Sequence, residues 1–153
     1  MIIKIAIAVG VLVTAALLMK KKDMTYRQSI LKTIYPAIMW SSGKAGSKQV
    51  QENVSNKKGS VEFYSLTTKD IAGNAFSFEQ FKGKKVLIVN TASDCGYTGQ
   101  YEALEQLHKQ YGSKLVVIGF PANDFKGQEK SDNQNIAAFC KKNYGVSFPL
   151  MEK

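Results

Sequence analysis

The sequence predicts an α/β protein whose central strands run parallel. Two continuous runs of β-branched and apolar residues, at 84–92 and 114–121, have the composition of buried strands. A helical pattern separates them, and a strand, a helix and a strand at about 30 residues per unit favour a right-handed crossover. With 153 residues, 44% apolar and 22% charged, the chain has room for one ordinary domain and does not resemble collagen-like or wholly disordered sequences.

The N-terminal segment is apolar with basic flanks. Residues 5–19 carry no charge and are followed by three lysines at 20–22. Fifteen helical residues measure about 22 Å, short of the ~30 Å hydrocarbon core unless flanking residues contribute. We expect residues 1–22 to form an uncleaved membrane anchor, and a cleaved signal peptide or a buried helix are the alternatives. The protein is therefore expected to be membrane-associated, on a side that the sequence leaves open.

Residues 23–60 are expected to connect this segment to the folded domain. Apolar residues recur at near-helical spacing over 26–40, which predicts a short amphipathic helix that is interrupted or kinked at Pro36. Residues 41–60 are small and polar without apolar periodicity, as is typical of a flexible linker. The folded domain is predicted at residues 61–153.

The first half of this domain is predicted to contain a hairpin, a buried strand and a helix. Residues 61–66 alternate apolar and polar side chains like a half-buried strand, and residues 69–78 predict a hairpin that turns at Gly73 and Asn74. After the 84–92 strand, apolar side chains at helical spacing predict a helix, with Thr98 as its N-cap and Gly112 as its C-cap.

The second half predicts a buried strand, a helix and the start of a further strand. After the 114–121 strand, Ile136, Phe139 and Cys140 mark one face of a helix that ends near Tyr144. Residues 147–151 have the pattern of a buried strand, and its continuation would lie beyond the last residue. Because an incomplete strand leaves a sheet edge unpaired, we expect the chain to be C-terminally incomplete or completed in another way.

The net charge of +9 does not indicate nucleic-acid binding. Residues 1–60 hold ten basic and two acidic residues, whereas residues 61–153 hold eleven basic and ten acidic ones. The positive charge lies beside the apolar segment, and the domain is nearly neutral. The excess charge is therefore better explained by basic residues that flank a membrane anchor than by a nucleic-acid-binding face. Two cysteines and one histidine cannot complete an all-Cys/His zinc site, so no metal or cofactor is indicated.

Cys95 is the candidate nucleophile. It follows the 84–92 strand, at the carboxyl end of a strand, where open α/β sheets bind ligands. Amides at the start of the next helix would stabilise a thiolate there, and Gly96 would allow substrate or backbone to approach closely. Position alone also leaves open an inert buried cysteine.

The remaining candidates have a plain structural interpretation. Cys140 lies on an apolar helix face, as an inert core thiol does, and its distance of 45 positions from the first cysteine excludes a CxxC redox site. His108 is expected to be solvated on the polar side of its helix rather than a ligand. Lys126 and Lys130 flank Gln128 and are expected to be solvated, although they could attract an anionic thiol such as glutathione.

Three motifs follow one another in the domain: NTASDCGYTGQY, FPANDFKGQE and FCKKNYGVSFPLMEK. In this order and spacing they resemble the glutathione peroxidase family, which has a thioredoxin-like fold, and above all its cysteine-containing, thioredoxin-dependent branch. The resemblance covers about residues 61–153. It implies that Cys95 is the peroxidatic cysteine and Gln128 the catalytic glutamine. It also implies that Cys140 is the resolving cysteine, in place of the inert thiol that its position suggests.

The chain departs from the family pattern at three points. Ala122 and Asp124 stand where the family usually has Cys and Gln. The Trp-Asn pair that the family uses in catalysis would lie well beyond residue 153. Trp40, the sole tryptophan, lies in the segment before the domain and cannot replace it.

The function implied by the resemblance is that of a thiol peroxidase. Cys95 would reduce hydrogen peroxide or an organic hydroperoxide and become a sulfenic acid. Cys140 would then form a disulfide with it, which thioredoxin or glutathione would reduce, and the protein would protect against oxidative stress. We expect this disulfide to require unwinding of residues 132–143. The alternative is a truncated, non-catalytic, membrane-tethered thioredoxin-like binding module.

Overall fold

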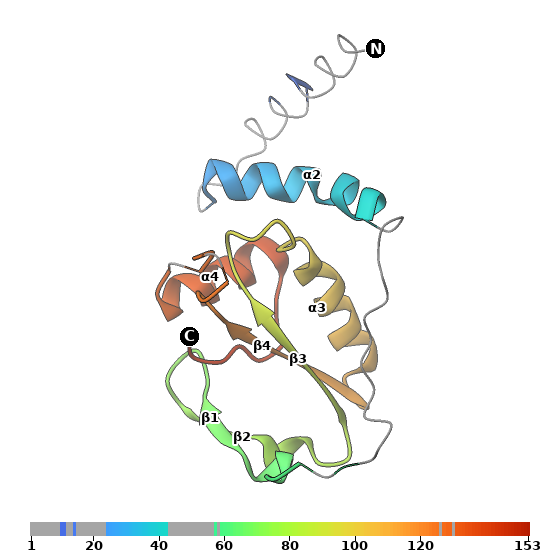
Figure 1. Cartoon of the computed structure of the whole chain (residues 1–153), viewed down its shortest axis with the longest axis vertical. Helices are drawn as coiled ribbons and strands as arrows, with labels where there is room; N and C mark the ends of the chain where they lie inside the picture. The colour runs from blue at the N-terminus through green and yellow to red at the C-terminus, as the bar shows by residue number, and fades with distance from the viewer. Residues whose placement is uncertain are drawn as a thin grey trace.

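The architecture is known from a computed structural model, which has the predicted alternation of strands and helices (Figure 1). The structure describes residues 10, 11, 14, 24–42, 57, 59–125, 127–129 and 131–153. In chain order, its elements are α2 (Tyr26–Ser42), the 3-10 helix η1 (Phe63–Ser65), β1 (Thr67–Lys69), β2 (Ala75–Ser77), the 3-10 helix η2 (Phe78–Phe81), β3 (Lys85–Thr91), α3 (Gln100–Tyr111), β4 (Leu115–Pro121) and α4 (Asn133–Tyr144).

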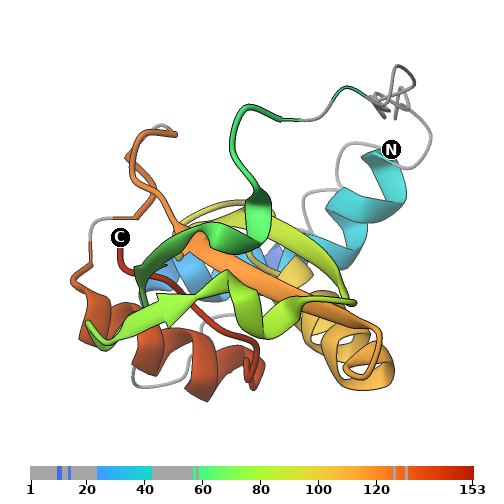
Figure 2. The same cartoon turned by 90° about the horizontal axis from the view of Figure 1, so that it is seen from below.

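The centre of the domain is the predicted parallel pair, β3 and β4. Their register runs from Lys85 opposite Leu115 to Thr91 opposite Pro121, and α3 makes the crossover between them. Alternate side chains of the two strands enter two cores on opposite faces. One core packs against α3 and α4, and the other packs against η1, β2 and η2, as Figure 2 shows from below. The predicted α/β fold class is confirmed.

The two central strands differ in burial, although their sequences predict similar cover. Val117 and Ile118 of β4 are fully buried, whereas Ile88 of β3 is 48% exposed. β4 has β3 on one side and the C-terminal segment on the other, while β3 pairs only with β4 among the described residues. The expectation of cover on both faces therefore holds for β4 and is wrong for the middle of β3.

The hairpin forms as predicted, and the strand predicted before it does not. β1 and β2 pair antiparallel around a turn in which the Asp70 carboxylate accepts the amides of Ala72 and Asn74, both at 2.9 Å. Residues 61–66 instead contain η1. The Phe63 ring packs edge-on against Phe78 with centroids 5.1 Å apart. The alternating pattern of residues 61–66 therefore reflects the aromatic packing of a short 3-10 helix rather than strand pairing.

The C-terminal segment lies beside β4, where a further strand was predicted, but only isolated bridges form. Leu150 bridges Gly119 in parallel and Met151 bridges Asp70 antiparallel. Gly119 permits this approach, because a Cβ there would lie 2.6 Å from the Leu150 Cδ2. Met151 is fully buried, so this segment completes the core between β4 and the hairpin.

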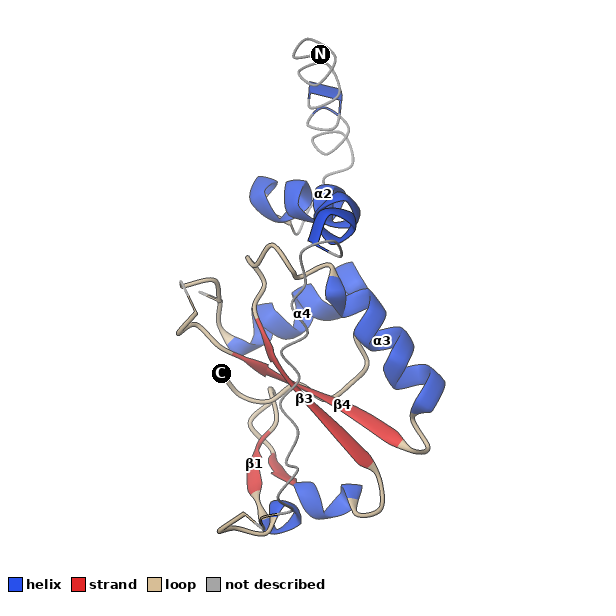
Figure 3. Cartoon of the chain, turned by 45° about the vertical axis from the view of Figure 1, so that its right-hand side comes forward, coloured by secondary structure: helices blue, strands red, loops and turns tan. Residues whose placement is uncertain are grey.

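α2 packs against the domain instead of standing apart from it (Figure 3). The Lys32 ammonium donates to the Asn143 carbonyl at 2.6 Å, pairs with Glu102 at 2.9 Å and lies 4.3 Å from the centroid of the Tyr144 ring. Met24, just before α2, belongs to the buried core. The helix continues through the exposed Pro36, so the expected interruption there is wrong.

The membrane localisation predicted from residues 1–22 is also corrected. In the part of the chain that the structure describes, no helix is both long and apolar enough to cross a membrane. α2, the longest element described, has 17 residues and measures about 26 Å, and it carries Arg27 and Lys32. Most of the segment itself, residues 1–9, 12, 13 and 15–22, lies outside the described residues.

Candidate active site

The loop between β3 and α3 carries Cys95 at the carboxyl end of the parallel pair, as predicted. Cys95 is partly exposed and lines a pocket of about 200 Å³. The β3 end, the loop after β4 and Gln128 complete this pocket, whose lining residues are Asn90, Thr91, Ala92, Cys95, Ala122, Phe125 and Gln128. The two parallel strands thus deliver a thiol and an amide to one concave site.

The backbone around Cys95 contacts its sulfur directly. The Tyr97 amide donates to the Cys95 Sγ at 3.4 Å. Thr98 does not cap α3 as predicted. Its hydroxyl donates instead to the carbonyls of Ala92 and Cys95, at 2.8 and 2.7 Å, and Gly99 is the N-cap. Thr98 therefore closes the loop that holds Cys95 rather than starting the helix.

Gln128 is tied to this loop through its backbone. The Asp94 amide donates to the Gln128 carbonyl at 3.0 Å. The residue before Cys95 is thus hydrogen-bonded to Gln128 itself. Cys95 and Gln128 line the same pocket. The roles assigned to them by resemblance stay predictions.

Cys140 is not part of this pocket. It is 2% exposed on α4, inside the core with Tyr101, Phe139 and Tyr144, and both cysteines are free thiols. Burial, and to a smaller extent the nearby Glu129 carboxyl, raise the pKa of the Cys140 thiol to about 12. In this conformation Cys140 is an unreactive thiol, and a resolving role would require α4 to rearrange.

Glu129 is a site residue that the sequence analysis missed. It is 1% exposed, and its Oε2 accepts both the amide and the hydroxyl of Ser93, each at 2.8 Å. Burial raises the pKa of its carboxyl, against the effect of the two Ser93 hydrogen bonds. The only sequence signal was its position next to Gln128, because an acidic residue in a polar loop is normally solvated.

The other candidates lie away from this chemistry. His108 is half-buried, its Nδ1 accepts the Val117 amide at 3.4 Å and its ring lies edge-on to Phe148, so the expected solvated position is wrong. Lys126 and Lys130 lie outside the described residues. Among the residues described, no cluster of three or more His, Cys, Asp or Glu could hold a metal.

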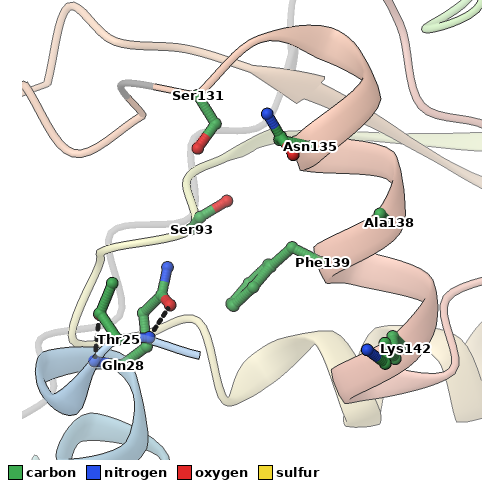
Figure 4. A pocket seen from close by; sticks show the side chains of 8 residues that line it. All are labelled: Thr25, Gln28, Ser93, Ser131, Asn135, Ala138, Phe139 and Lys142. Atoms are coloured by element: carbon green, nitrogen blue, oxygen red, sulfur yellow. Dashed lines mark hydrogen bonds between the residues drawn. The ribbon is translucent and has the colours of Figure 1, made fainter. Parts of the chain in front are cut away.

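A second pocket of about 260 Å³ lies between the start of α2, the loop residue Ser93 and α4 (Figure 4). Thr25 and Gln28 form a reciprocal capping box there, with the Thr25 amide donating to the Gln28 Oε1 at 2.8 Å and the Gln28 amide to the Thr25 Oγ1 at 3.2 Å. This pocket contains no cysteine, so the candidate chemistry belongs to the first pocket.

An α/β fold with a partly exposed cysteine in a pocket after a central parallel strand is the arrangement of a thiol-dependent redox protein. The family model described as glutathione peroxidase matches residues 63–153. The chain therefore belongs to the glutathione peroxidase family, and the thioredoxin-like fold that the resemblance implied is confirmed.

Individual relatives agree with this assignment. Over 93 residues, the chain is 53% identical to the glutathione peroxidase-like peroxiredoxin GPX5 of Chlamydomonas reinhardtii, covering 60% of this chain and 57% of the relative. It is 52% identical over 94 residues to the glutathione peroxidase-like peroxiredoxin 2 of Saccharomyces cerevisiae, covering 61% and 58%. A solved structure described as Trgpx in apo form is 38% identical, with a TM-score of 0.44, and the match covers 62% of this chain and 55% of that one. The chain thus spans little more than half the length of the relatives it matches.

Proposed function

We propose that the chain is a thiol peroxidase that reduces hydrogen peroxide or organic hydroperoxides with Cys95 as the nucleophile, and so protects against oxidative stress. The observation that carries the proposal is the pocket that Cys95 shares with Gln128, in which the Tyr97 amide points at the sulfur. The names of the relatives, which are glutathione peroxidase-like peroxiredoxins, support the same reaction.

The first proposed step is the attack of Cys95 on the peroxide. The Cys95 thiolate attacks one peroxide oxygen, so that an S–O bond forms while the O–O bond breaks. The departing oxygen takes a proton and leaves as water or an alcohol, and Cys95 becomes a sulfenic acid. The Gln128 amide would donate a hydrogen bond to the sulfur or to a peroxide oxygen and so stabilise the charge that moves between them.

The second step requires Cys140 to leave the core. Its thiol would displace water from the Cys95 sulfenic acid and form a disulfide, which an external thiol, thioredoxin or glutathione, would reduce by exchange. α4 begins at an Asp132 cap, whose carboxylate accepts the Asn135 amide at 2.8 Å, and ends at Gly145 in the left-handed conformation. We expect unwinding of residues 132–143 to precede this step.

Peroxide consumption by the full chain tests the proposal. The wild type, C95S and C140S would each be supplied with hydrogen peroxide and either thioredoxin with its reductase or glutathione. We expect C95S to be inactive, and C140S to lose turnover with thioredoxin while still reducing one peroxide per chain. Equal rates for wild type and C95S would refute the peroxidase and favour a non-catalytic thioredoxin-like binding module.

A further inference from the structure

Three hydrogen bonds join the segment before Cys95 to the segment that contains Gln128. Two run from the amide and hydroxyl of Ser93 to the Glu129 Oε2, each at 2.8 Å. The third runs from the Asp94 amide to the Gln128 carbonyl at 3.0 Å. Both segments are loops, and neither belongs to a strand or helix that would fix it. These bonds connect the loop that Thr98 closes around Cys95 to the loop that carries Gln128.

Glu129 is itself held from the other side. Its amide donates to the Asn123 Oδ1 at 3.0 Å, in the loop that follows β4. Glu129 thus links two loops: its carboxyl holds Ser93, after β3, and its backbone amide is bonded to Asn123, after β4. Figure 4 shows Ser93 on the loop that faces α4, with its hydroxyl turned away from the backbone. The linkage lies behind the Cys95 pocket, since neither Ser93 nor Glu129 lines it.

Burying this carboxyl is costly, and the fold does not fully compensate for it. Among the residues that the structure describes, none is hydrogen-bonded to the buried Glu129 Oε1. An unsatisfied buried polar atom destabilises a fold, so an apolar residue at 129 would suit the core better if packing were the only requirement. What Glu129 adds is a two-point hold on Ser93, which a hydrophobic side chain cannot provide.

We propose that Glu129 is a positioning residue that holds Ser93, and through it Cys95, in place beside Gln128. This inference rests on the proposed function, because it assigns Glu129 a part in the peroxide reaction of Cys95. Glu129 touches neither the pocket nor the sulfur, and it acts only through the loop. A glutamine at this position would accept the same two hydrogen bonds, whereas an alanine would accept neither.

The fold supplies a matched control in Glu105 of α3. Glu105 is 4% exposed and accepts the amide of Ser147 at its Oε2 and the hydroxyl at its Oε1, and it also pairs with Lys109 at 3.0 Å. Ser147 follows α4 and does not line the Cys95 pocket. E105A therefore removes a similar pair of serine hydrogen bonds, and an ion pair besides, at a site away from the Cys95 loop. S93A removes one of the two bonds to Glu129 and serves as a milder variant if E129A does not fold.

The test compares wild type, E129Q, E129A, S93A and E105A as full-length chains. Loss of the free Cys95 thiol to hydrogen peroxide and to iodoacetamide is followed by peptide mass spectrometry, together with amide exchange at residues 93–95. We expect E129A to slow the peroxide reaction about tenfold or more and to speed amide exchange by a similar factor. Alkylation should change less than about threefold, because it does not need Gln128. E129Q and E105A should keep the wild-type peroxide rate within about threefold, and S93A should fall between.

The outcomes separate this inference from the proposed function. Unchanged exchange in E129A, or E129Q as slow as E129A, or an equal loss in E105A, would overturn the positioning role. A wild-type Cys95 that reacts with peroxide no faster than it does in the urea-unfolded chain would refute the peroxidase. In that case the exchange data would still decide whether Glu129 holds the loop, but this role would have no consequence for a peroxidase reaction.

Discussion

Gly99 permits α2 to rest on the loop that carries Cys95, and G99A should displace the helix. A Cβ at residue 99 would lie 2.3 Å from the Tyr35 Cγ and 2.4 Å from its Cδ1, far inside the 3.4–4 Å of ordinary contact. Gly99 has helical dihedrals, φ −57° and ψ −20°, so alanine carries no backbone penalty there. The whole effect of the substitution is therefore steric.

The magnitude follows from how the clash can be relieved. Overpacking that is absorbed by small shifts costs about 1–3 kcal/mol, and a gap of more than 1 Å has to be opened between residue 99 and the Tyr35 ring. If the strain exceeds the free energy with which α2 packs on the domain, the helix will detach instead. The packing free energy of α2 is therefore the largest loss of stability that the substitution can cause. We expect G99A to lower the free energy of unfolding by about 1–3 kcal/mol and to speed amide exchange in α2.

Urea unfolding of G99A, Y35A and the double variant measures the coupling directly. The double variant should be no less stable than Y35A alone, a coupling of about 1–3 kcal/mol. G96A is the control at the same interface, because its Cβ would meet only the Leu31 Cδ2 at 4.0 Å, an ordinary contact. Additive losses from G99A and Y35A, or a G96A as destabilised as G99A, would refute the packing of α2 on this loop.

Two further predictions concern buried ionisable groups. Burial opposes the ionisation of Glu105, yet hydrogen bonds from Ser147 and the Lys109 ammonium lower the pKa of its carboxyl below the ordinary 4.5. The stabilising effect of the ionised carboxyl is therefore present above pH 4.5 and disappears as the pH falls through the lowered pKa. The difference in the free energy of unfolding between wild type and E105Q should be about 1–3 kcal/mol at neutral pH and should narrow when urea unfolding is repeated below pH 4.5. A difference that does not change with pH would contradict this prediction. Because burial raises the pKa of Cys140 to about 12, iodoacetamide at pH 8 should modify Cys95 at least about tenfold faster than Cys140, and equal rates would show that α4 opens freely.

The elements that could be predicted from the sequence are those whose pattern has one physical explanation. Residues 115–121 carry no charged or polar side chain because β4 is covered on both faces, and the face with Ile136 and Cys140 repeats at helical spacing because α4 packs one side on the core. The alternating pattern of residues 61–66 has two possible explanations, strand pairing and aromatic packing. The Phe63 ring contacts Phe78, so the second explanation is the correct one. Local pattern alone could not distinguish the two.

The site was only partly predictable for a similar reason. Cys95 and Gln128 could be nominated because their motifs resemble a family and strand ends gather ligands. Thr98 and Glu129 act through contacts that depend on the folded loop: one donates to carbonyls three and six residues back, and the other accepts from Ser93, 36 residues away. Helix capping by Thr98 was a sound local expectation, and the closed loop around Cys95 replaced it.

The central claim is that Cys95 is activated toward peroxide by the pocket it shares with Gln128. A single pulse of hydrogen peroxide on the reduced full chain, with dimedone present to trap sulfenic acid, tests this directly when the two cysteine peptides are quantified over time. The account predicts trapping at Cys95 at least about 100-fold faster in the native chain than in the chain unfolded in urea. Equal rates in the two states would contradict it, because the fold would then contribute nothing to the reactivity of the sulfur.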